Sequence, residues 1–224
     1  MAEAPRDGAT TVSLFSRKPR TKTEIVAAAD RARARGRVKK AIAGYRKALE
    51  SDPTDPSVNV KLAPLLAREG DSAGGASCFR VAASRHLAQG FTDRAAAVNL
   101  AATAVFPLDD GFRLELARLN VARGRKLDAV NTLLEGGRAQ ARARRPDVAA
   151  ALLGRALEIE PWHLETCLAL VPILARSGHP VEARQFVDGL LTVYRGPARR
   201  RIRWVAFRTW PGVRTLWRWL TASG

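Results

Sequence analysis

Residues 39–53 read KKAIAGYRKALESDP, and this stretch decides the fold. Ala41, Tyr45 and Ala48 follow one another at steps of four and three, which places them on one face of a helix. The alanines leave room for a neighbouring helix to approach closely, and the tyrosine ring fills the space between them. Pro53 ends the helix, because proline disfavours helical geometry in the residue before it. The stretch therefore predicts a helix that packs closely on another helix.

The same element recurs along the chain at a fixed spacing. Turn positions 36, 70, 90, 124, 144 and 178 are separated alternately by 34 and 20 residues, which together make a period of 54 residues. The segments LAPLLAREG, LARLNVARG and LVPILARSG occupy equivalent places in this period. A fixed period of this size indicates a repeat architecture, in which stacked helices share one continuous core. The repeat positions are Gly36, Ala41, Tyr45, Ala48, Pro53, Gly70, Gly90, Ala95, Pro107, Gly124, Ala129, Pro161, Gly178 and Ala183.

This pattern resembles the tetratricopeptide repeat family, whose helix–turn–helix unit is about 34 residues long. The match is clearest over residues 22–55, with Gly36 in the turn. The offsets of 20 residues depart from the family, because they make the helices near 72–89 and 126–143 serve two repeats each. A 54-residue unit would then hold three helices. The resemblance implies an all-α fold, a right-handed solenoid of about ten helices over residues 22–195 with a short C-terminal helical segment.

The resemblance also implies a concave surface that is lined by the first helix of each hairpin. Arginines at the positions facing this groove would suit an acidic peptide or a C-terminal carboxylate, because a guanidinium can donate two hydrogen bonds to a carboxylate. The alternative is that these arginines are solvated charges on ordinary helix surfaces. The groove candidates are Arg68, Arg80, Arg118, Arg138, Arg142 and Arg176, with Asp30 and Glu165 as acidic exceptions.

The C-terminal residues 196–224 differ in composition from the repeats, with four of the five tryptophans and no acidic residue. One hypothesis is a cap that covers the last apolar face of the solenoid. A second is an interfacial helix on an anionic membrane, since tryptophan and arginine both favour the headgroup region. A third is docking onto nucleic acid or an acidic partner helix. The candidate anchor residues are Arg199, Arg200, Arg201, Trp204, Trp210, Val213, Leu216, Trp217 and Leu220.

Positive charge is concentrated at the two ends of the chain. The formal net charge is +17 over 224 residues; residues 1–40 carry eleven basic and four acidic groups, and residues 189–224 carry eight basic groups and no acidic one. Basic ends favour phosphate groups or acidic protein surfaces as partners. Residues 1–21 are polar and are expected to be disordered. A short docking motif around Leu14 and Phe15 is the alternative to a solvated tail.

The sequence offers no support for catalysis. The three histidines lack metal-ligand spacing and lie in no nucleophile motif, and the two cysteines are expected to be core thiols. We therefore expect no cofactor, no metal site and no enzymatic activity. No apolar core of signal-peptide length and no run long enough to span a bilayer is visible, which favours a cytoplasmic location.

These observations predict a protein–protein interaction scaffold that binds a partner peptide or helix on the solenoid surface. The alternative is a peripheral membrane or nucleic-acid-associated adaptor that is anchored by its basic, tryptophan-rich C-terminal segment. Dependence on ionic strength separates the two, because arginine–phosphate anchoring weakens steeply with salt.

Overall fold

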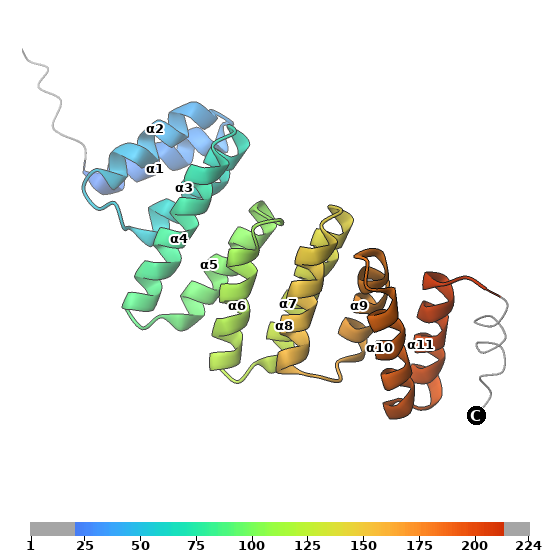
Figure 1. Cartoon of the computed structure of the whole chain (residues 1–224). Helices are drawn as coiled ribbons and strands as arrows, with labels where there is room; N and C mark the ends of the chain where they lie inside the picture. Colours follow the sequence, from blue (N-terminus) through green and yellow to red (C-terminus); the bar gives the residue numbers. More distant parts are fainter. Residues whose placement is uncertain (1–20, 213–224) are drawn as a thin grey trace, which may run out of the picture. The chain divides into compact units, whose positions relative to one another are not determined.

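A computed structural model of the protein describes residues 21–212, which hold eleven α-helices and no β-strand (Figure 1). The predicted all-α fold of tetratricopeptide-like helical hairpins is confirmed. Residues 1–20 of the predicted tail and the predicted anchor residues Val213, Leu216, Trp217 and Leu220 lie outside the described residues. The helices are α1 (Lys22–Ala34), α2 (Val38–Leu49), α3 (Pro56–Arg68), α4 (Ser72–Ala88), α5 (Thr92–Val105), α6 (Asp110–Ala122), α7 (Lys126–Arg142), α8 (Pro146–Ile159), α9 (Leu164–Arg176), α10 (Pro180–Val193) and α11 (Gly196–Thr209).

The chain divides into two compact units, Met1–Pro53 and Thr54–Gly224. In the first unit, α1 and α2 form a helical hairpin around Ala41, Tyr45 and Ala48, of which none is more than 1% exposed. The Tyr45 hydroxyl donates a hydrogen bond of 2.6 Å to Asp30 on α1. Burial and, to a smaller extent, this hydrogen bond to the carboxylate raise the pKa of Tyr45 to about 12.

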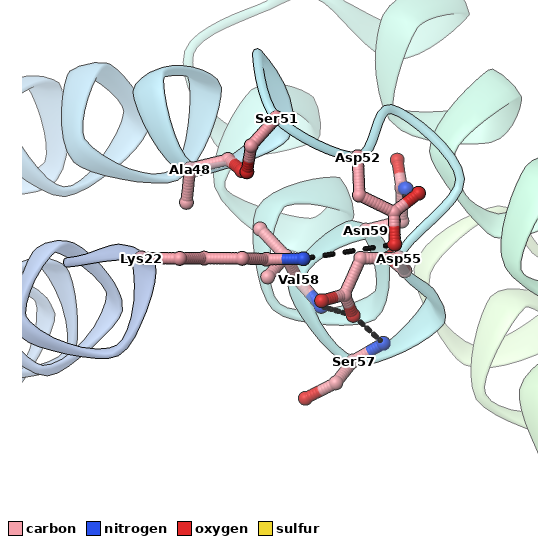
Figure 2. Close-up of polar contacts among 8 residues, drawn as sticks. All are labelled: Lys22, Ala48, Ser51, Asp52, Asp55, Ser57, Val58 and Asn59. Carbon is pink, nitrogen blue, oxygen red and sulfur yellow. Dashed lines mark hydrogen bonds and ion pairs between the residues drawn. The ribbon is translucent and has the colours of Figure 1, made fainter.

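Polar contacts fix the chain on each side of Pro53 (Figure 2). Within the first unit, Lys22 forms an ion pair with Asp52 at 3.6 Å, and the Ser51 hydroxyl donates to the Ala48 carbonyl. At the start of the second unit, the Asp55 carboxylate accepts hydrogen bonds from the first backbone N–H groups of α3 and caps that helix.

The helices of the second unit repeat with the period of the sequence. In the second unit each helix packs against the next one along the chain, and α4 and α7 are the middle helices of two successive periods. One period therefore holds three helices, which are α3–α5, α6–α8 and α9–α11. The helices α3, α6 and α9 begin at residues 56, 110 and 164, and α4, α7 and α10 begin at residues 72, 126 and 180.

One backbone conformation recurs in the turns between helices. Gly70, Gly90, Gly124 and Gly178 all have φ between +73° and +93°, a left-handed conformation that glycine adopts without steric cost. Arg144 takes the corresponding place in the turn between α7 and α8 with φ of +59°, which a residue with a Cβ atom adopts at a cost.

The core of the second unit depends on small residues where helices approach closely. A Cβ atom at Gly75 in α4 would lie 2.7 Å from the Ala63 carbonyl oxygen of α3. Phe79, Phe106 and Phe112 fill the adjacent space, with ring centroids 6.1–6.2 Å apart. The helices α3 and α9 both continue through an internal proline, Pro64 and Pro172 respectively, so neither proline ends its helix.

Candidate partner-binding surface

A pocket of about 510 Å³ lies between α9 and α11, and nine residues line it. Residues on α9 supply one side, and residues on α11 and just after it supply the other. Two tryptophans and two arginines are among them. The lining residues are Leu168, Pro172, Ala175, Arg176, Trp204, Val205, Arg208, Thr209 and Trp210.

The helix α11 docks on α9 and α10 through a narrow stripe of residues beside the pocket. Ile202, 1% exposed, is the buried residue of α11, and it packs with Val171 of α9 and Leu190 of α10. Val205 contacts the same cluster from one turn further along and is only half-buried. The pocket lies beside this stripe, and Val205 also lines it.

The electrostatics of the pocket are one-sided. Arg176 and Arg208 are exposed on its lining, and neither forms an ion pair within residues 21–212. The guanidinium of Arg184 lies 5.6 Å from the centroid of the Trp210 ring. Among residues 21–212, no acidic residue lines the pocket. The site therefore combines an apolar floor with positive charge that has no carboxylate of its own.

A second pocket, of about 460 Å³, occupies the equivalent place one period earlier, between α6 and α8. Leu114 and Val121 line it at the positions that Leu168 and Ala175 hold 54 residues later. Its charges neutralise one another. Arg118 forms hydrogen bonds of 2.7 and 2.8 Å with the Glu115 carboxylate, which lower the pKa of that carboxyl, and Arg155 pairs with Glu158 at 3.0 Å.

Four of the six predicted groove arginines contact carboxylates of the chain or line the pocket. Arg80 pairs with Asp109 at 2.5 Å and lies over the Phe112 ring. Arg118 pairs with Glu115 as described, and Arg176 lines the α9–α11 pocket. Arg138 forms an ion pair with the Glu165 carboxylate at 3.7 Å, and Arg201 forms a second ion pair with the same carboxylate at 2.7 Å. Arg68 and Arg142 are exposed.

The structure brings together residues that sequence reasoning had assigned to separate hypotheses. The groove candidate Arg176 lines the same pocket as the anchor candidates Trp204 and Trp210. The anchor candidates Arg199 and Arg200 lie elsewhere on α11. Arg208 and Leu168 were not singled out from the sequence. The repeat of leucine at 114 and 168 was the available signal for Leu168.

The ionisable residues outside this pocket include one buried thiol, that of Cys167. Burial raises the pKa of the Cys167 thiol to about 11, so the thiol stays protonated at neutral pH. The described residues contain no cluster of histidine, cysteine and acidic side chains that could hold a metal ion. Among residues 21–212, no helix has both the length and the apolar character needed to cross a membrane.

The hairpins, their turns and the close-packed small residues define a helical repeat protein. Residues 140–201, which include α8, α9 and α10, match the family model described as Tetratricopeptide repeat. This part of the chain is therefore similar to the tetratricopeptide repeat family, and repeat proteins of this fold generally act as protein–protein interaction scaffolds. Comparison with curated protein sequences gives no match.

Several solved structures are similar to the chain. The MamA protein is 16% identical, with 76% of this chain and 90% of that chain covered and a TM-score of 0.29. PilF of Pseudomonas aeruginosa is 14% identical, with 90% of this chain and 97% of that chain covered and a TM-score of 0.30. A tetratricopeptide repeat protein of Parabacteroides merdae is 10% identical, with coverages of 84% and 85% and a TM-score of 0.29.

Proposed function

We propose that this protein is a non-enzymatic scaffold that binds a segment of a partner protein in the pocket between α9 and α11. The observation that carries the proposal is the pair Arg176 and Arg208, two exposed guanidinium groups beside an apolar hollow without a carboxylate partner. The equivalent pocket between α6 and α8 offers a similar volume, but its own ion pairs occupy its charges. Comparison of the two pockets favours the α9–α11 site for an anionic partner.

The chemistry of the pocket specifies the kind of segment that fits. A carboxylate, either from an acidic side chain or from a C-terminus, would accept two hydrogen bonds from a guanidinium. An apolar side chain next to that carboxylate would fill the hollow against Leu168 and Trp210. The partner segment is therefore an acidic peptide or helix with an apolar anchor residue.

The proline inside α9 leaves one backbone carbonyl of this helix without its usual donor. Pro172 has no N–H group, so it cannot donate the helical hydrogen bond to the carbonyl of Leu168, four residues earlier. Both residues line the pocket.

The test compares two variants that remove the same charge. Arg176→Gln/Arg208→Gln alters the α9–α11 pocket, and Arg118→Gln/Arg155→Gln is the matched control in the α6–α8 pocket. Partners are captured from nuclease-treated lysate with the full chain and each variant, and the binding segment is then titrated as a synthetic peptide with its acidic groups free or amidated. Each charge-assisted contact contributes about 1.5–3 kcal/mol, so we expect at least about a tenfold loss of affinity per arginine removed.

Two results would contradict the proposal. One is a partner that binds the Arg176→Gln/Arg208→Gln variant as tightly as it binds the control. The other is a peptide whose affinity is unchanged when its acidic groups are amidated, because the carboxylate contact is the basis of the proposed selectivity.

A further inference from the structure

The outward face of α11 is a second surface, which shares Trp204 and Arg208 with the pocket but extends beyond it. With about 100° of rotation per residue, Arg200, Trp204 and Phe207 lie on the side of the helix opposite the docked residue Ile202. Trp204 is 42% exposed, which is unusual for the largest apolar side chain. Its ring packs beside that of Phe207, with centroids 5.8 Å apart. The helix therefore presents an aromatic pair at the centre of its outward face.

The repeat period shows how far this face departs from the rest of the chain. Phe207 takes the position that Tyr45, Asn99 and Leu153 hold one to three periods earlier, and each of those three side chains is buried. In α11 the same position is only half-buried and lies beside an exposed tryptophan. The repeat position that is buried in the three earlier periods is therefore partly exposed at Phe207 in α11.

Arginines flank the aromatic pair on both sides. Arg203 lies toward one edge of the outward face, and Arg208 lies toward the other. With Arg199, Arg200 and Arg201, they give α11 five basic residues and no acidic one. The face thus has an apolar centre and cationic edges, the arrangement of a helix that lies in a membrane interface.

We propose that this face of α11 docks on an anionic membrane surface, with Trp204 and Phe207 at the headgroup level and the arginines on lipid phosphates. Tryptophan favours that depth, and arginine keeps its head in water while its stem covers apolar surface. Binding to single-stranded nucleic acid would instead use rings whose faces are free to stack on bases, whereas these two rings pack beside each other. Neither Arg200 nor Phe207 lines the α9–α11 pocket, so the two surfaces can be altered separately.

The test is co-sedimentation of the full chain with vesicles of phosphatidylcholine alone and of phosphatidylcholine mixed with phosphatidylglycerol. We expect the chain to bind only the mixed vesicles and to dissociate as ionic strength rises. Arg200→Gln/Arg203→Gln should weaken binding by about fivefold per arginine. Phe207→Ser, which leaves the charge unchanged, should weaken it by about tenfold. Arg85→Gln/Arg142→Gln removes the same charge from exposed positions on α4 and α7 and is the matched control.

Circular dichroism establishes that each variant keeps the helix content of the wild type. If Phe207→Ser loses helix, the Arg200→Gln/Arg203→Gln variant decides the question alone. The proposal is overturned if the full chain does not bind the mixed vesicles, or if Arg200→Gln/Arg203→Gln weakens binding no more than the control. Retention on a single-stranded oligonucleotide without vesicle binding would assign the face to nucleic acid and would also overturn it.

Discussion

The closest approach between α3 and α4 gives a prediction whose sign depends on the structure. Replacing glycine by alanine in the interior of an exposed helix stabilises it by about 1 kcal/mol, because alanine loses less conformational entropy. At Gly75, however, the new Cβ atom would lie 2.7 Å from the Ala63 carbonyl oxygen and 3.0 Å from Cζ of Phe106. One of these neighbours is backbone, so relief requires the two helices to move apart.

The magnitude follows from the two opposing effects. Insertion of a methyl group into a closely packed contact costs about 1–3 kcal/mol, which offsets the gain in helix propensity. We therefore expect Gly75→Ala to lower the free energy of unfolding by about 1 kcal/mol. Gly154 in α8 is the matched control, because a Cβ atom there would have nothing within 4 Å. Gly154→Ala should raise the free energy of unfolding by about 1 kcal/mol.

The assay is urea unfolding of the full chain and both variants, followed by far-ultraviolet circular dichroism. The midpoints should move in opposite directions from that of the wild type, with an unchanged dependence on denaturant. If Gly75→Ala is as stable as Gly154→Ala, the two helices do not approach each other at Gly75. The assignment of one close-packed glycine to this hairpin would then be wrong.

Three further predictions concern single residues. Arg144→Gly should raise the free energy of unfolding by about 1 kcal/mol, because it relieves a left-handed conformation at φ +59°; a lower urea midpoint would contradict this. Burial, together with the charge of nearby Arg94, lowers the pKa of His86 below its usual 6.5. As pH drops below about 6.5, the unfolded chain therefore binds this proton before the folded chain does, and the free energy of unfolding should fall. His86→Gln should flatten that pH dependence in thermal melts, and an unchanged slope would assign it to another group. Tyr45→Phe should cost about 1 kcal/mol at neutral pH through the lost bond to Asp30. The wild-type protein should lose stability as pH rises from 10 to 12, where Tyr45 titrates, and Tyr45→Phe should remove this loss.

The helices and their buried faces were predictable because they depend on local spacing. Ala41 and Tyr45 lie on one helical face whatever surrounds them, and an apolar face of that kind has to be covered. The glycine turns were equally predictable, because a left-handed glycine that ends a helix needs no information from the rest of the chain.

The surface was not predictable, because it depends on which residues meet across long separations. Arg80 was proposed as a groove residue, yet it pairs with Asp109, 29 residues away in the sequence. Arg138 and Arg201 meet at Glu165 only because α7 and α11 both pack against α9. Helical periodicity shows which side chains face outward, but it does not show which carboxylate lies next to which guanidinium.

The last helix differs from the repeats at the positions where close packing is needed. Ala41, Ala95 and Ala149 are fully buried at successive periods, and Arg203 stands at the next such position. Likewise Trp210 stands one period after Ala156, which is also fully buried. A long charged side chain and a large ring cannot occupy the space that an alanine leaves between two helices. The helix α11 therefore docks by Ile202 instead, and arginine and aromatic side chains of α11 face outward.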